Sequence, residues 1–374
     1  EGLRMGRAWA PDWGGSSGFG PAAGYGEGAG LIVGASYGAT RYGFRRLPYA
    51  WTASVTGLYA TGAGGFGVAA DVDYRLENSR LALTLEGRAT EFEAFRFYGF
   101  GNDSELLPDD VSLVMQDRVG LHPALTLHLG AMPGRQSESE REEEEEERGV
   151  PFGGAGKGAV FEGEVSFGPL LQWTSPRLPA GSPLAAADPG GVGQLGALLR
   201  ARAKRTDRPA APRRGFAVGA HASAYPALWK LDGHFGDLYA EAAAYLPLLG
   251  QTHLALRAGG ERAFGDFPAF EAALLGGRTT LRGYRWNRFA GEGMAFGNAE
   301  LRVPVDTVDI FFRGELGVFG IADAGRVWVD GASPGGWHTG FGGGAWFAFL
   351  GRALSAAYVS GEDGRAYVWL GLPY

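Results

Sequence analysis

Four arginines lie close together in the segment LLGGRTTLRGYRWNRF, residues 274–289. A guanidinium is always charged, and its planar set of N–H donors fits a carboxylate or a phosphate. The segment can therefore bind an anionic ligand, or its arginines can pair with carboxylates of the same chain. Alternating sequence on both sides predicts strands, so this basic segment is expected to be a connection between them. The arginines are Arg278, Arg282, Arg285 and Arg288.

Other residue types that carry chemistry show no matching pattern. The six histidines have no spacing typical of metal ligands, and no serine lies in a nucleophile-elbow sequence. GAGGFG, residues 62–67, fits G-x-G-x-x-G, but a strand-like VAADVDYRL follows it where a nucleotide loop needs a helix. We therefore interpret it as a β-turn and expect no metal, no cofactor and no catalytic residue.

Composition favours many short strands. The 374 residues include 65 Gly and no Cys, 13% are aromatic, and only 20% are charged. The glycines have no G-x-y period, which excludes collagen, and the net charge of −7 argues against nucleic acid as a partner. No run of 18 apolar residues occurs, so an ordinary transmembrane helix is excluded. A β-barrel, in contrast, crosses lipid with alternating segments of about ten residues.

Period-two alternation recurs along the whole chain. In MAFGNAELRVPV, residues 294–305, Asn298, Glu300 and Arg302 share one face. In the next segment, Asp323 lies on the face that carries the charges. We predict sixteen strands, at residues 29–41, 49–61, 66–77, 79–92, 110–119, 123–132, 158–174, 192–205, 214–226, 235–247, 251–263, 293–305, 309–328, 337–349, 351–360 and 364–374.

An even number of antiparallel strands can close without an open edge, as lipid requires. The sequence therefore predicts an all-β fold, a sixteen-stranded antiparallel transmembrane β-barrel over residues 29–374, after a Gly-rich N-terminal segment at 1–28. Long connections such as 175–191 and 264–292 are expected to face the exterior, and short turns the periplasm. A soluble array of β-sandwiches is the alternative, but no break marks the end of one compact core.

The most acidic run is SESEREEEEEER, residues 137–148. Such a block is typical of a solvated loop. Strand parity assigns it to the periplasmic side, where so long a connection is unusual, and one miscounted strand would assign it to the exterior, so both sides stay open. RAKRTDRPAAPRR, residues 202–214, is its basic counterpart and is interpreted as a turn that contacts acidic lipid headgroups or a partner.

Three segments in order carry a family resemblance. GGRTTLRGY (276–284), GNAELRVP (297–304) and IADAG (321–325) together resemble the bacterial surface antigen superfamily, the BamA-TamA superfamily of outer-membrane insertases and two-partner secretion transporters. FYGFGN (97–102) and TDRPAAPRRG (206–215) are similar to further landmarks of that family. Ile321 departs from its pattern, which has Phe or Gly there.

The resemblance implies a sixteen-stranded barrel whose long loop between strands 11 and 12 folds into the lumen. The tip of that loop carries R-G-[FY], matched here by Leu281, Arg282, Gly283 and Tyr284. The resemblance also implies that Asp323 and Glu300 clamp Arg282, and that Tyr284 packs against the wall. Physical chemistry agrees, since a guanidinium removed from water requires a fixed anion. Arg278, Arg285 and Arg288 are then the arginines left to meet solvent.

The terminal segment AYVWLGLPY is similar to the C-terminal signal of outer-membrane barrels. Gly371 weakens strand pairing and Pro373 has no N–H to donate, so we expect a weak seam against the first strand, at 30–43. In the superfamily such a seam is a lateral gate toward lipid. Ala366, Val368, Leu370, Leu372 and Tyr374 are expected to share one outward face.

We therefore expect a barrel of the bacterial outer membrane that assists insertion or translocation of proteins through this seam. Its expected partners are outer-membrane lipid, a client polypeptide and a periplasmic protein. Residues 1–28 are too few for a POTRA module, which favours a POTRA-less or truncated member. The alternatives are a passive channel or a membrane anchor plugged by loop 264–292. A lipid deacylase is a third class, although no serine and histidine pair supports it.

Overall fold

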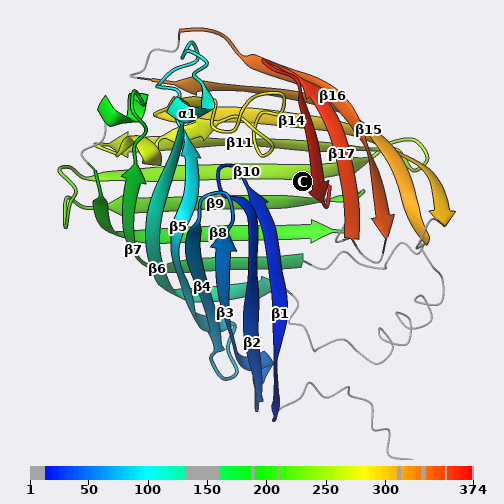
Figure 1. Ribbon diagram of the computed structural model, residues 1–374. Helices are drawn as coiled ribbons and strands as arrows, with labels where there is room; N and C mark the ends of the chain where they lie inside the picture. Colours follow the sequence, from blue (N-terminus) through cyan, green and yellow to red (C-terminus); the bar gives the residue numbers. More distant parts are fainter. Residues whose placement is uncertain are drawn as a thin grey trace, which may run out of the picture.

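A computed structural model describes residues 13–130, 161–186, 190–208, 211–309, 313–329, 334–349 and 352–372. These residues form one antiparallel sheet of sixteen strands, in which neighbours in sequence are neighbours in space (Figure 1). A second, two-stranded sheet lies in the connection between β11 and β14. No helix of this described part is long and apolar enough to cross a membrane. The expected all-β antiparallel fold is confirmed.

The large sheet runs without a crossover from one end of the chain to the other. Its strands are β1 Gly15–Gly26, β2 Gly30–Gly43, β3 Arg46–Ala60, β4 Gly65–Arg75, β5 Leu81–Arg96, β6 Leu113–Gly130, β7 Phe161–Arg177, β8 Val192–Thr206, β9 Gly215–Tyr225, β10 Phe235–Pro247, β11 His253–Gly265, β14 Gly293–Asp309, β15 Arg313–Trp328, β16 His338–Phe349, β17 Arg352–Ser360 and β18 Arg365–Leu370.

The large sheet has the predicted sixteen strands, but only because two errors in the prediction cancel. The Gly-rich segment expected to precede the sheet already forms β1, and the segments expected at 110–119 and 123–132 are one strand, β6. Pro123 lies inside β6 and remains paired with Leu85 of β5, whereas the pairing with β7 skips residues 122–124. A proline without an N–H interrupts one ladder and leaves the strand intact.

Side chains alternate between two chemically different faces of the sheet. Phe19, Tyr37 and Val55 are direct partners across β1, β2 and β3, and all three are exposed. On the opposite face, Thr52 of β3 lies between Thr40 and Asp73 of the neighbouring strands. The apolar row faces outward and the polar row faces the concave side, which is the pattern expected of a strand between lipid and a lumen.

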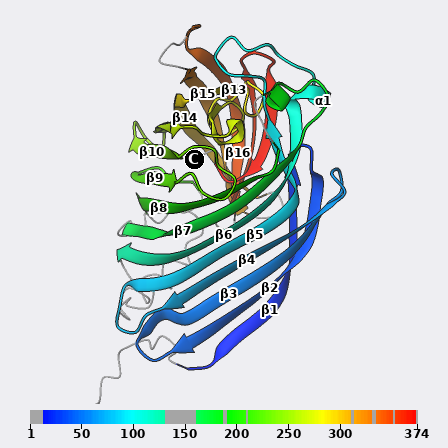
Figure 2. The same ribbon diagram turned by 90° about the vertical axis from the view of Figure 1, so that its left-hand side faces the viewer.

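The sheet has two free edges. Within the described residues, β1 pairs with β2 alone and β18 pairs with β17 alone. Figures 1 and 2 show the two edges diverging toward the start of β1, drawn in blue. The segment at 30–43, expected as the first seam strand, is instead β2 and is paired on both sides. The edge facing the seam is therefore β1.

An aromatic cluster covers the concave face of the C-terminal strands. Phe319, Trp346 and Trp369 lie together on β15, β16 and β18, and Trp346 is 1% exposed. Gly317 is the cross-strand partner of Trp346 and leaves room for its indole. A Cβ added at Gly317 would lie 2.1 Å from Cζ2 of Trp346.

Gly317→Ala is therefore expected to destabilise the fold by about 1–3 kcal/mol, the usual cost of overpacking a core. Gly320→Ala in the same strand is the matched control, because a Cβ there meets no atom within 4 Å. Urea unfolding of both variants in lipid vesicles measures the difference. Equal stability of the two variants would contradict the packing described.

Candidate functional site

The connection at 266–292 forms a compact loop between β11 and β14. It contains a 3₁₀ turn, η2 (Ala269–Glu271), and two short strands, β12 (Ala273–Leu275) and β13 (Phe289–Gly291), which pair with each other. Residues 276–288 form the tip of this hairpin. Gly276 and Gly283 both have positive φ, a conformation that L side chains rarely adopt. The tip is therefore folded back tightly.

Arg282 at this tip is held by two carboxylates of neighbouring strands. Its Nε donates to Oδ2 of Asp323 at 2.7 Å, and its Nη2 donates to Oδ1 at 2.6 Å. The backbone N–H of Arg282 also donates to Oδ2 of Asp323, at 3.1 Å. Nη1 pairs with Oε1 of Glu300 on β14. The structure thus brings together the three residues that the sequence grouped.

The clamp is almost completely removed from water. The side chains of Glu300 and Asp323 are 0% exposed, and that of Arg282 is 1% exposed. Arg302 pairs with the second oxygen of Glu300 at 2.8 Å, so two arginines balance two carboxylates. Burial would lower the pKa of Arg282, but hydrogen bonds and attraction from Asp323 and Glu300 outweigh it and raise that pKa. The site is therefore a neutral, buried ion cluster.

The other three motif residues contact the wall and the edge strand. Leu281 is 0% exposed and packs in a cluster with Leu275 and Phe289. The hydroxyl of Tyr284 donates to the carbonyl oxygen of Thr339, at 3.2 Å. The N–H of Gly283 donates to the hydroxyl of Tyr367 on β18, at 3.0 Å. The motif is therefore bonded to a free edge of the sheet.

Two of the arginines expected to meet solvent are instead ion-paired. Arg288 is 4% exposed; its Nε donates to Glu362 at 2.8 Å, and its Nη2 donates to the carbonyl oxygen of Ser104 at 2.7 Å. Arg285 pairs with Asp363 and with Asp109. Only Arg278 is exposed as predicted. The prediction was wrong because the acidic residues come from two other connections, which the sequence does not place nearby.

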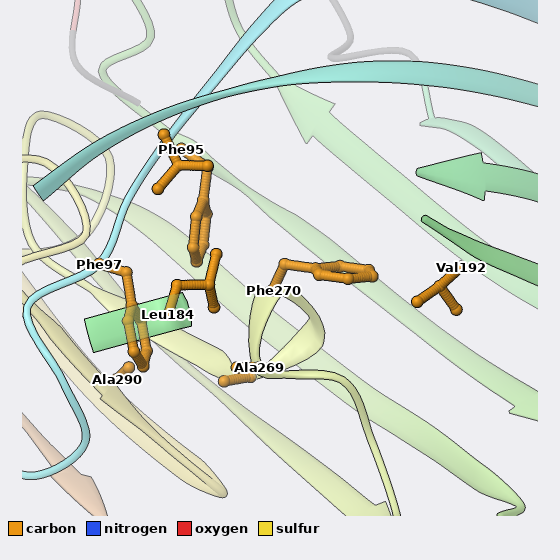
Figure 3. Packing of buried hydrophobic residues seen from close by; sticks show 9 residues of the cluster. Phe95, Phe97, Leu184, Val192, Ala269, Phe270 and Ala290 are labelled. Carbon is orange, nitrogen blue, oxygen red and sulfur yellow. The ribbon is translucent and has the colours of Figure 1, made fainter. Parts of the chain in front are cut away.

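An apolar cluster holds the base of the loop. Phe270 of η2 packs with Phe95 near the end of β5, with Phe97 and Leu184 from two connections, and with other side chains at the same end of the sheet (Figure 3). Ala290 belongs to this cluster, and its carbonyl oxygen accepts the N–H of Gly101 at 2.8 Å. The loop is therefore fixed at its base by apolar packing and at its tip by charge.

Two landmark segments supply contacts that the sequence did not assign. Asn102 of FYGFGN donates to the carbonyl oxygen of Val327 at 2.9 Å and accepts the N–H of Val327 at 3.0 Å. Asp207, in the turn between β8 and β9, accepts the N–H groups of Arg213 and Arg214. A polar residue beside glycines in FYGFGN was the available signal for the first contact.

The C-terminal residues divide between the two faces. Val368 and Leu370 are exposed on the outward face, as expected. Gly371 has φ +103° and ends the alternation, so Leu372 packs against the inner aromatic cluster and does not face outward as expected. Pro373 and Tyr374 lie outside the described residues, as does the acidic run at 137–148.

Comparison with known proteins agrees with this geometry. Residues 199–345, which contain the motif and both carboxylates, match the Omp85 superfamily domain. The chain is similar to the structure of BamA from Haemophilus ducreyi lacking POTRA domains 1-3, with 13% identity, a TM-score of 0.60, and coverage of 96% of this chain and 70% of that chain. It is also similar to CdiB from Escherichia coli, with 11% identity, a TM-score of 0.56, and coverage of 96% and 62%, respectively. No curated protein matches this sequence.

The superfamily resemblance inferred from the motif is therefore confirmed over residues 199–345, and this match agrees with the expected location in the bacterial outer membrane. The similar structures share the fold of this chain at low identity. The chain spans 62% of the length of CdiB, so activities of the longer proteins are not transferred by similarity alone.

Arg282→Ala should lower the free energy of unfolding by about 3–5 kcal/mol, because it removes the ion pair of buried Asp323 and one of the two that Glu300 makes. Arg278→Ala in the same loop is the control and should change stability by less than about 0.5 kcal/mol, since Arg278 is exposed. Urea titration in vesicles measures both.

A double-mutant cycle tests the pair of Arg282 and Asp323. Asp323→Ala should lower the free energy of unfolding less in the Arg282→Ala background than in the wild type. Fully additive losses in the double variant would show that the two side chains do not act as a pair.

Proposed function

We propose that this protein assists polypeptides in inserting into, or crossing, the outer membrane. Its sheet would close as a transmembrane barrel, with the loop at 266–292 folded into the lumen. The Omp85 superfamily match supports this role in general. A client strand would pair with the unpaired backbone of β1 or β18. The reaction breaks no covalent bond; it lowers the barrier to pairing a strand inside lipid.

The observation that carries the proposal is the pair of free edges. In hydrocarbon, each unpaired N–H or C=O group costs several kcal/mol, so an edge must find a partner. β1 has twelve residues and β18 has six, so closure of one against the other leaves about half of β1 unpaired. β1 also contains Pro21 and five glycines, which weaken pairing. An incoming strand can occupy such an edge by β-augmentation.

The buried loop supports a controlled seam better than an open pore. The bond from Gly283 to Tyr367 connects the arginine clamp directly to β18. A shift of the edge strand therefore acts on the clamp, and the clamp limits that shift. A client for this seam would be a polypeptide strand with alternating apolar and polar residues, matching the two faces of the sheet.

A passive channel or a membrane anchor is the competing proposal, and conductance tests whether the loop plugs the barrel. Deleting residues 276–290 removes the hairpin tip, and in planar bilayers this should raise single-channel conductance severalfold over the wild type, because the loop fills the lumen. A wild-type conductance equal to that of the deletion would indicate that the loop does not plug the barrel.

A disulfide across the seam tests the role of the edges. Cysteines at Ala23 of β1 and Val368 of β18, which are both outward-facing and lie opposite each other when the loop ends of the strands are aligned, should form a bond that blocks client insertion into vesicles. The chain has no native cysteine, so no other disulfide competes. Activity should return on reduction.

The matched control joins two strands that are already paired. Thr40 and Thr52 are direct partners on β2 and β3, with hydroxyl oxygens 3.1 Å apart. A disulfide between cysteines at these positions should leave insertion unchanged. Full insertion by the variant with the seam disulfide would remove the proposed role of the edges.

A further inference from the structure

We infer that Arg96, Asp109 and Arg285 form an ionic relay that holds the two edge hairpins together at the loop end of the seam. The relay begins at Glu27 in the β1–β2 turn and ends at Asp363 in the β17–β18 turn. These two turns belong to the hairpins that carry the free edges of the sheet. The relay would close the seam at this end. Its role in gating this seam rests on the proposed function.

The first half of the relay joins the β1–β2 turn to α1 (Asp109–Ser112). Arg96, the last residue of β5, donates from Nε to Oε1 of Glu27 at 2.8 Å, and its Nη2 is 2.6 Å from the same oxygen. Its Nη1 donates to Oδ1 of Asp109 at 3.0 Å. The side chain of Arg96 is only 4% exposed, whereas those of Glu27 and Asp109 are 38% and 64% exposed, so solvent weakens both pairs from the carboxylate side.

The second half joins α1 to the β17–β18 turn. Arg285 of the hairpin tip pairs through Nη1 with the same oxygen of Asp109 that Arg96 binds. Its Nε donates to Oδ2 of Asp363 at 3.2 Å. Burial alone would raise the pKa of Asp109, but hydrogen bonds and attraction from Arg96 and Arg285 hold it below its ordinary value. Asp109 is therefore the junction of the relay.

The relay connects two turns that the pairing of strands does not bring together. In the strand order, β1 and β18 are at opposite ends of the sheet, so no ladder of hydrogen bonds brings their turns together. The relay connects them through a short helix and the loop that also carries Arg282. Figure 1 shows the edges diverging at the other end, where β1 begins. The seam is therefore expected to open first away from the loops.

Spin labels on the cysteine-free chain test the relay in lipid nanodiscs. One pair of labels, at Tyr25 and Ala366, reports the loop end, and a second pair, at Ser17 and Leu370, reports the opposite end. Asp109→Asn keeps the side-chain shape and removes the junction charge. This variant should raise the population of longer label-to-label distances at the loop end about fivefold, because the surface ion pairs of Asp109 with Arg96 and Arg285 are lost.

Two further variants sharpen the measurement. Asp363→Asn removes only the last link and should give a smaller increase of the same kind. Asp110→Asn changes the adjacent exposed carboxylate of α1 and should leave the distances as in the wild type. An unchanged distance distribution at the loop end in Asp109→Asn would overturn the relay, as would an equal change in Asp110→Asn.

The outcome for the relay is separable from that for the proposed function. Client insertion is measured on the same samples. Longer distances at the loop end, in a protein that inserts no client, would support the relay and remove the proposed function. Unchanged distances in a protein that inserts clients normally would overturn the relay and leave the proposed function standing.

Discussion

The position of the long loop depends on one buried charge. A guanidinium at 1% exposure is stable only where carboxylates surround it. Glu300 lies on β14, and Asp323 lies on the adjacent strand β15 opposite Asn298, two residues before Glu300. Arg302 engages the remaining oxygen of Glu300, so the cluster is formally neutral and tolerates burial. Displacing Arg282 would remove the ion pair of buried Asp323 and leave Glu300 paired with Arg302 alone, so the observed position of the loop tip is strongly favoured.

Several contacts that matter for the seam follow from that location. Gly283 comes directly after Arg282 in the chain and reaches Tyr367 on β18, while Arg285 and Arg288 reach the turn that precedes it. The loop thus links the interior of the sheet to its C-terminal edge. The apolar cluster around Phe270 fixes the other end of the loop. A client strand at this edge would lie beside the long loop, whose position is set by the buried ion pairs of Arg282.

Much of this arrangement could be predicted from the sequence, because alternation marks inward and outward residues directly. The shared face of Glu300 and Asp323, together with the motif around Arg282, was sufficient to group the clamp. β1 was not predicted because its inward residues are glycine, alanine or serine, so its two faces show little contrast between polar and apolar side chains. β6 was divided because Pro123 is typical of a strand end. The partners of Arg285 and Arg288 lie in distant connections, and spacing along the chain does not indicate such meetings.

Hydrogen–deuterium exchange of the Arg282→Ala variant in nanodiscs tests most directly whether the clamp controls the edge. The account predicts faster exchange of the amides of β18, residues 365–370, because the bond from Gly283 to Tyr367 is lost with the position of the loop. Amides of β9, which contact neither the clamp nor the edge, should exchange as in the wild type. Unchanged protection of β18 in a variant whose loop has become exchangeable would contradict the coupling between the buried arginine and the seam.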